Sequence, residues 1–365
     1  MARHVIKLGS GIVAHEDGAL RSGTLAAICA QVAAARARGD DVVVVSSGAI
    51  ARGIQMLGLD GRPSAIEDLQ AASAIGQGRL YRVYDELLEG HGVRAAQVLL
   101  TFFDLGHRSH YLNARGTLRR LLDWGVVPVV NENDTTATDE ITFGDNDFLA
   151  AQVAILVEAD DLVLLTSVDG LMTADPSRDP QARVIAEISD FDALEQAATI
   201  TSSTSVLGSG GMRSKVVAAE MATAAGIPTV ICNGLREDAL GAVLAGESGE
   251  GTRFPARALG YSSFKLWLRY AKPVRGTLTV DDGAAGALRD GGTSLLPVGI
   301  VAVQGDFHAG DAVEVRGSEG LLGKGIVGYD AADLSRVTGL KSAAARKLIP
   351  RGPEEAVHRD YFVRA

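Results

Sequence analysis

Short runs of β-branched and apolar residues alternate with long, alanine-rich amphipathic segments through residues 1–253. This alternation is typical of a parallel sheet covered by helices. Each strand-like run is almost continuously apolar, which indicates that both faces of the sheet are buried. The expected strands are Val5–Leu8, Val42–Ser46, Ala95–Thr101, Val126–Val130, Asp161–Thr166 and Thr229–Cys232. The expected helices include Leu25–Arg38, Ala65–Leu88 and Met212–Ala225.

The pattern changes after about Arg253 to shorter runs separated by turn residues. The segment Asp311–Arg316 alternates polar and apolar side chains, which indicates a small β-rich module. A length of 365 residues also favours two domains over one. We therefore expect an α/β domain over residues 1–253, a linker over 254–275 and a second domain over 276–365.

Composition narrows the class of protein. Hydrophobic residues make up 47% of the chain and charged residues 22%, a balance that allows a buried core. The formal net charge of -10 gives no support to sequence-independent binding of nucleic acid. Cys29 and Cys232 lie in apolar stretches and are expected to be buried thiols. Neither a signal segment nor an apolar run long enough for a membrane span is found, so we expect a cytoplasmic protein.

Five polar or glycine-rich segments follow expected strands or open expected helices. Ligands of an open parallel sheet bind beyond the carboxyl ends of the strands, so these segments are expected to form one site. Neither a GxxxxGK[ST] phosphate loop nor a complete dinucleotide fingerprint occurs, so a nucleotide would have to be held in another way. The segments are Lys7–Gly11, Ser46–Ile50, Asn131–Asp134, Gly144–Asp147 and Gly208–Lys215.

Lys7 and Lys215 are candidates for binding a phosphoryl group, whose transfer requires cations and amide donors. Lys7 lies in the first expected strand, where an ammonium group is costly unless it faces an anion. The alternative for Lys7 is an edge-strand lysine with a solvated head. Lys215 follows two glycines that open a helix, so its side chain should point back toward an anion-favouring helix N-terminus. The alternative for Lys215 is a solvated helix lysine.

Acidic residues crowd an expected loop-to-helix junction. Asp134, Asp145 and Asp147, with Asn146, could bind an ammonium group, order the two lysines or hold magnesium indirectly. Asp145 could equally be a helix cap. Ser47 and Gly48 could likewise be only a strand-to-helix cap.

Taken together and in this order, the motifs resemble those of the glutamate 5-kinases, members of the amino-acid kinase superfamily with a C-terminal PUA domain. The resemblance covers almost the whole chain and implies a three-layer α/β sandwich with a largely parallel central sheet, plus a small β-rich PUA barrel. The kinase motifs are Val5–Ser10, Ser46–Ile50, Asn131–Asp134, Gly144–Asp147, Leu164–Pro176 and Gly208–Lys215. The PUA-like segments are Gly276–Gly283, Ser294–Ile300 and Gly305–Asp311.

The activity implied by this resemblance is ATP-dependent phosphorylation of the γ-carboxylate of L-glutamate, giving L-glutamyl 5-phosphate for proline synthesis. Lys7 and Lys215 would neutralise the transferring phosphoryl group, and Asp147 would position both lysines. Glutamate would be held by Ser47, Gly48, Asp134 and Asn146. The ATP site would be lined by Lys7, Gly9, Ser10, Thr166, Ser167, Ser209, Gly210, Gly211, Met212, Arg213, Ser214 and Lys215, with Mg²⁺ held mainly by the ATP phosphates. No general base is expected, because the attacking carboxylate is already ionised at neutral pH.

Further expectations also come from the resemblance: homo-oligomers, feedback inhibition by proline and transient contact with glutamyl-phosphate reductase. Ser167 replaces an aspartate of the family pattern, which puts a nucleotide contact in doubt. The PUA-like segment has more acidic than basic side chains, so RNA binding is not expected of it. Two alternatives remain open: a related kinase acting on acetylglutamate, aspartate or a nucleotide, and an RNA-binding protein with an inactive kinase-like half.

Overall fold

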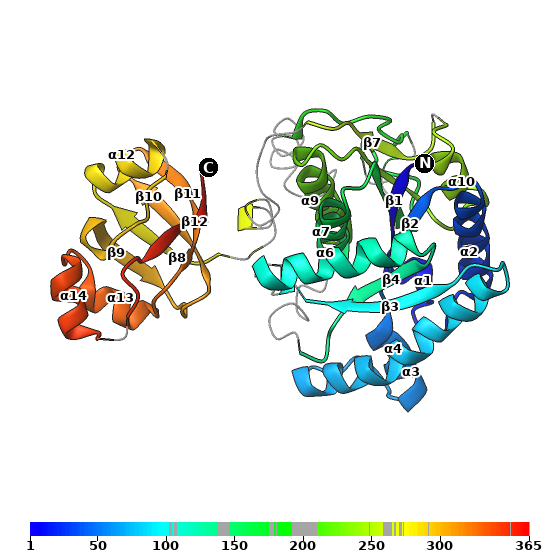
Figure 1. Ribbon diagram of the computed structural model, residues 1–365, viewed down its shortest axis with the longest axis horizontal. Coiled ribbons are helices and arrows are strands. Elements are labelled where there is room, and N and C mark those ends of the chain that lie inside the picture. The colour runs from blue at the N-terminus through cyan, green and yellow to red at the C-terminus, as the bar shows by residue number, and fades with distance from the viewer. Residues whose placement is uncertain are drawn as a thin grey trace. The chain divides into compact units, whose positions relative to one another are not determined.

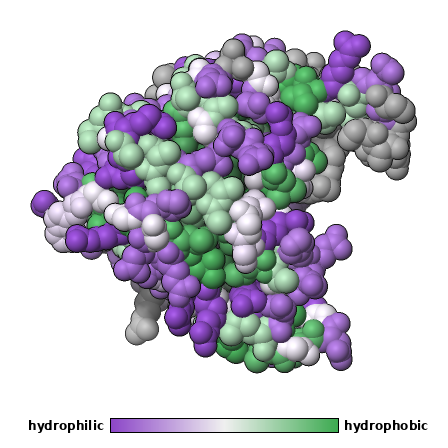
Figure 2. Space-filling view, turned by 90° about the vertical axis from the view of Figure 1, so that its right-hand side faces the viewer, coloured by the Kyte–Doolittle hydropathy of each residue, from purple (hydrophilic) through white to green (hydrophobic). Residues whose placement is uncertain are grey.

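The computed structural model divides into two compact units, Met1–Gly260 and Tyr261–Ala365. Within the described residues, no helix combines the length and apolar character that crossing a bilayer requires. The face shown in Figure 2 mixes hydrophilic with hydrophobic residues, as the surfaces of globular proteins do. The structure describes residues 1–101, 104–105, 108–136, 146–174, 179, 181–191, 210–247, 249–257, 265, 268–269, 272, 274–290, 292–350 and 352–364.

A seven-stranded sheet with the strand order β3-β4-β2-β1-β5-β6-β7 forms the centre of the first unit (Figure 1). Neighbouring strands are parallel except for β6 and β7, which are antiparallel. The carboxyl ends of the parallel strands therefore lie along the same end of the sheet. The strands are β1 (Arg3–Leu8), β2 (Asp41–Val45), β3 (Ala95–Leu100), β4 (Val127–Glu132), β5 (Asp161–Thr166), β6 (Thr229–Asn233) and β7 (Thr252–Phe254).

Helices cover both faces of this sheet, which gives three layers (Figure 1). In the part of the chain described, the helices of this unit are α1 (Ser10–Val13), α2 (Ser22–Ala37), α3 (Ala49–Leu57), α4 (Ile66–Glu89), α6 (Arg108–Asp123), α7 (Asn146–Val157), α9 (Gly210–Ala224) and α10 (Ala239–Leu244). One core cluster joins α2, α4 and α10 to one face of the sheet. Helices α6, α7 and α9 lie on the other face.

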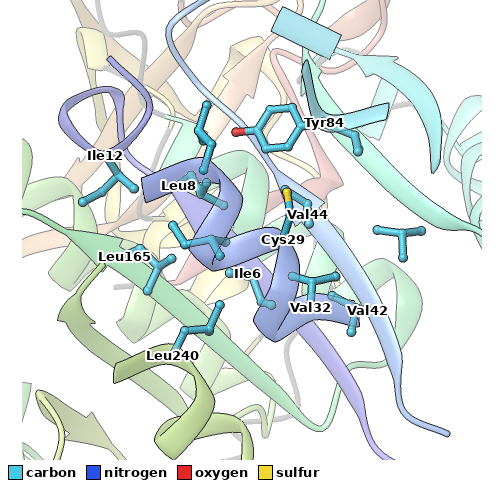
Figure 3. Close-up of a cluster of buried hydrophobic side chains, with 14 of the residues drawn as sticks. Ile6, Leu8, Ile12, Cys29, Val32, Val42, Val44, Tyr84, Leu165 and Leu240 are labelled. Carbon is cyan, nitrogen blue, oxygen red and sulfur yellow. The ribbon is translucent and has the colours of Figure 1, made fainter. Parts of the chain in front are cut away.

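The core under α2, α4 and α10 is built from alternate strand positions, because successive side chains of a strand point to opposite faces. Burial raises the pKa of Cys29, and likewise that of Cys232, to about 12. Both cysteines are free and buried, which confirms the expectation from sequence. Figure 3 shows side chains of the core cluster that joins α2, α4 and α10 to the sheet, among them Ile6, Leu8, Ile12, Cys29, Val32, Val42, Val44, Tyr84, Leu165 and Leu240.

The six expected strands are all present, with small shifts at their ends. Lys7 lies in β1, between β2 and β5, so the edge-strand alternative for this lysine is wrong. The expectation that every strand is buried on both faces is wrong for β3. This strand is at the edge of the sheet, and Leu99 is 38% exposed. The short strand β7 was not expected, since it has no apolar run of its own.

The second unit contains a five-stranded sheet with the order β12-β11-β10-β8-β9 and its own apolar core. Its strands are β8 (Val274–Val280), β9 (Ile300–Gly305), β10 (Ala312–Gly317), β11 (Gly320–Val327) and β12 (Val357–Arg364). Its described helices are α12 (Asp282–Asp290), the 3₁₀ helix η1 (Pro297–Gly299), α13 (Ala331–Val337) and α14 (Ser342–Leu348). The expected linker 254–275 overlaps β7 and β8 at its ends, and Leu268 within it is buried against Ala312 and Val363. The exact domain limits stay a prediction.

Candidate active site

A cavity of about 530 Å³ opens where the carboxyl ends of β1, β2, β4 and β5 meet the start of α9. The sequence predicted a ligand site at this end of the sheet, where the parallel strands have their carboxyl ends. The predicted residues that line the cavity are Lys7, Gly9, Ser10, Ser47, Gly48, Asp134, Asn146, Thr166, Ser167, Gly211, Met212 and Lys215. Gly210, Arg213 and Ser214 lie in the first turns of α9 but do not line the cavity. Ser209, Gly144 and Asp145 lie outside the described residues.

Asp147 bridges the two predicted lysines. Its Oδ1 lies 2.6 Å from the Nζ of Lys7, and its Oδ2 lies 2.9 Å from the Nζ of Lys215. Asp147 is fully buried in the first turn of α7, where the helix dipole favours a negative charge. Removing either partner from such a buried ionic group would leave a charge poorly compensated. Lys7 and Lys215 line the cavity, and Asp147, which does not line it, joins the two lysines into one charged unit from the buried side.

Lys215 folds back along α9, as the sequence predicted. Its Nζ donates to the carbonyl of Gly211, one turn earlier, at 3.2 Å. The hydroxyl oxygen of Ser214 lies 3.0 Å from Oδ2 of Asp147 and 2.9 Å from the same carbonyl oxygen, so its single O–H can donate to either acceptor. The solvated-lysine alternative is therefore wrong, since Lys215 is only 7% exposed. Lys7 and Lys215 are also the only lysines in residues 1–260, so every other strong base there is an arginine.

Asn146 links the ends of two strands beside the cavity. Its Nδ2 donates to the carbonyl of Ser46 at 2.6 Å and to Oδ1 of Asn131 at 2.7 Å, and it lies 3.3 Å from the hydroxyl of Ser47. The amide N–H groups are thus used within the protein, and among the described residues no hydrogen bond to Oδ1 is found, so this oxygen can accept one from a ligand. An acceptor of this kind suits a cationic or hydroxyl group.

Asp134 is a half-buried carboxylate in the same cavity. The hydroxyl of Ser73 donates to its Oδ2 at 2.6 Å. Burial raises the pKa of Asp134, while the hydrogen bond from Ser73 and the charge of Arg62 act in the opposite direction. A partly desolvated carboxylate is stabilised by a cation, so Asp134 is suited to an ammonium group of a ligand.

Helix α4 supports the cavity through three residues that the sequence analysis missed. Besides Ser73, Gln77 accepts from the Nδ2 of Asn131 at 2.5 Å, and the hydroxyl of Tyr84 lies 2.9 Å from that of Ser46. All three lie on the buried face of α4. Polar side chains on the core-facing stripe of an amphipathic helix were the signal that could have identified them.

Two glycines have geometric roles. The N–H of Gly9 donates to the carbonyl of Leu165 at 3.3 Å, which ties the turn after β1 to the end of β5 beside the cavity. Gly48 has φ 94°, a left-handed conformation that glycine adopts without strain, at the turn from β2 into α3. The turn places Ser47 and Gly48 at the cavity.

Comparison with known proteins gives matches over the whole chain. The sequence signature of the amino acid kinase family matches residues 2–233, and that of the PUA domain matches residues 276–349. Glutamate 5-kinase of Meiothermus ruber is 45% identical over 367 residues, covering 100% of this chain and 96% of that protein. Glutamate 5-kinase of Burkholderia vietnamiensis is 44% identical and covers 99% of this chain and 97% of that protein. Glutamate 5-kinase of Pseudomonas entomophila is 45% identical with the same two coverages, 99% and 97%.

Solved structures that can be superimposed on this one share less of its sequence. Isopentenyl phosphate kinase has a TM-score of 0.49 and 17% identity, covering 69% of this chain and 99% of that chain. UMP kinase from Bacillus anthracis has a TM-score of 0.48 and 18% identity, covering 70% and 97% respectively.

Proposed function

Because this chain belongs to the amino acid kinase family and, within it, to the glutamate 5-kinases, we propose that it transfers the γ-phosphoryl group of ATP to the γ-carboxylate of L-glutamate. The product is L-glutamyl 5-phosphate, which is the first intermediate of proline biosynthesis. The observation that carries the proposal is the convergence of Lys7 and Lys215 on Asp147 in the wall of one cavity.

The geometry suits phosphoryl transfer to an anion. A γ-carboxylate oxygen attacks the γ-phosphorus, the bond from phosphorus to the β–γ bridging oxygen breaks, and ADP leaves with the electron pair. Lys7 and Lys215 would stabilise the charge on the transferring group, while Asp147 keeps both ammonium groups in place. No proton has to be removed from the nucleophile, because a carboxylate is ionised at neutral pH.

The other end of glutamate would lie at Asp134 and Asn146. Asp134 would bind the α-ammonium group, and Ser47, Gly48 and Asn146 would complete the pocket. Backbone amides at Ser10 and at the start of α9, together with Thr166 and Ser167, would contact ATP. Mg²⁺ would be carried mainly by the ATP phosphates.

The wider role follows from the same proposal. The enzyme would work in the cytoplasm as a homo-oligomer, be inhibited by proline and pass its labile acyl phosphate to glutamyl-phosphate reductase in a transient contact. The second unit would have a structural or regulatory role instead of binding RNA, because acidic side chains outnumber basic ones in residues 276–360.

Trapping the acyl phosphate tests the acceptor directly. The protein is incubated with MgATP and, separately, glutamate, aspartate, N-acetylglutamate or UMP, with hydroxylamine present to convert any acyl phosphate to a hydroxamate. ADP release is followed in parallel, because phosphorylated UMP gives no hydroxamate. We expect glutamate to give both products. Turnover with another acceptor would favour a kinase of different specificity. Salt-sensitive RNA binding in a gel shift, without phosphorylation of any acceptor, would favour an RNA-binding protein with an inactive kinase-like half.

The hydrogen bond from Ser73 to Asp134 predicts a pH effect. In Ser73→Ala the pKa of Asp134 should rise further, because one of the two influences that lower it is lost. Asp134 then ionises at higher pH, so the acid limb of the kcat/KM profile for glutamate should shift upward in pH. At neutral pH we expect KM for glutamate to rise about tenfold, with the KM for ATP unchanged. Ser73→Thr keeps the hydroxyl and is the control, and an identical pH profile in all three proteins would contradict the prediction.

A further inference from the structure

Arg62 lines the cavity although no motif of the sequence pointed to it. It lies in the loop between the end of α3 at Leu57 and the start of α4 at Ile66. Gly58, with φ 63°, ends α3 in the left-handed conformation. Pro63 directly follows Arg62 and disfavours helical backbone at that residue. The loop is therefore constrained on both sides of the arginine.

The charges along the cavity give Arg62 a distinct position. The described lining residues include three cations, Lys7, Lys215 and Arg62, and both lysines contact Asp147. Arg62 makes no hydrogen bond or ion pair within the described part of the chain, yet its charge lowers the pKa of Asp134. Arg62 and Asp134 thus line the same cavity, and Arg62 is not bound to a protein carboxylate among the described residues.

An amino acid that is phosphorylated on its side chain has two further charges to satisfy. Its γ-carboxylate must face the lysines, and its α-carbon carries an ammonium group next to a carboxylate. Resting on the proposed function, we infer that Arg62 binds the α-carboxylate of the acceptor while Asp134 binds the α-ammonium group. The opposite charges of Arg62 and Asp134 match those of the substrate's α-carbon.

This pairing makes Arg62 a specificity-determining residue. A guanidinium group can donate two parallel hydrogen bonds to a carboxylate, which selects for that planar group. Acceptors that keep the γ-carboxylate but lack a charged α-carboxylate would lose this contact. Arg62 is exposed and lines the cavity, so its guanidinium group is accessible to an entering substrate.

The test compares L-glutamate with L-isoglutamine, in which a carboxamide replaces the α-carboxylate and the γ-carboxylate is retained. Values of kcat/KM are measured by hydroxamate formation for the wild type, Arg62→Ala and Arg62→Lys. In Arg62→Ala we expect kcat/KM for glutamate to fall about 10- to 100-fold, while that for isoglutamine changes little. Arg62→Lys keeps the positive charge but lacks the paired N–H donors of a guanidinium group, so its kcat/KM for glutamate should lie between those of the wild type and Arg62→Ala. Where isoglutamine turnover is too slow to follow, its inhibition constant against glutamate is compared instead.

Arg79→Ala is the matched control, because Arg79 is an exposed arginine of α4 outside the cavity lining. The KM for ATP should stay unchanged in every variant. An active wild type whose Arg62→Ala variant loses the same factor with both acceptors, or loses nothing, would overturn the inference and leave the proposed function intact. A wild type that forms no hydroxamate from glutamate would overturn the proposed function, and with it the role of Arg62.

Discussion

Replacing Lys215 by alanine should lower kcat about a thousandfold, because one of the two cations beside the transferring phosphoryl group is lost. Its ammonium group lies 2.9 Å from Oδ2 of Asp147 and, with Lys7, forms a single charged unit in the cavity wall. Stabilisation that exists mainly in the transition state appears in kcat, so KM for glutamate should change far less. Steady-state kinetics with ATP and glutamate varied separately give the two effects.

The control for this variant is Lys341→Ala, which removes an exposed lysine of the second unit. Lys215→Ala retains the contact between Asp147 and Lys7, so we expect it to fold. Circular dichroism and thermal unfolding establish this. A folded Lys215→Ala protein with wild-type kcat would contradict the assignment of the lysine to phosphoryl transfer. Lys215→Arg should also be impaired, because a planar guanidinium does not reproduce the compact ammonium group.

Gly76→Ala should destabilise the first unit by about 3 kcal/mol or more, because a methyl group has no space there. A Cβ at Gly76 would lie 1.9 Å from the carbonyl oxygen of Ala49 and 2.6 Å from the backbone N of Gly53. Both contacts are with backbone of α3, so α3 and α4 would have to move apart. The same movement would displace Ser73 and Gln77, and we expect KM for glutamate to rise as well.

Gly78→Ala is a close control, since Gly78 lies in the same helix and a Cβ there would meet nothing within 4 Å. Alanine is the better helix former, so this change should stabilise the protein by about 0.5–1 kcal/mol. Urea unfolding of the three proteins measures the difference. Equal stabilities for Gly76→Ala and Gly78→Ala would show that α3 and α4 do not meet as closely as this structure has them.

The strands could be predicted from sequence because a buried parallel strand leaves a local signal, a short apolar run between longer amphipathic segments. The position of β3 at the edge of the sheet could not be predicted in this way, because strand order depends on pairings between distant segments. The three residues of β7 have no run long enough to recognise. Helix α9 was recognised by the glycines that open it, and the backward direction of Lys215 then followed from helix geometry.

The site was recognisable in part. The segments following the strands pointed to its location, and the resemblance to a family indicated that Asp147 contacts both lysines, as the structure confirms. The catalytic roles of these residues stay a prediction. Ser73 and Gln77 could not be assigned to the site, because their hydrogen-bond partners, Asp134 and Asn131, are far away in the chain. Arg62 could not be assigned either, because a single arginine in a loop has no local pattern that separates a binding residue from a solvated one.

The confinement of lysine to two positions in the first unit has a practical consequence for labelling. Within residues 1–260, the lysine amines that an acylating reagent could attack are those of the two lysines of the cavity. Because both ammonium groups are buried and paired with Asp147, they should acylate slowly in the folded protein. Peptide mass spectrometry of these two sites would therefore report opening of this part of the cavity wall without an engineered probe.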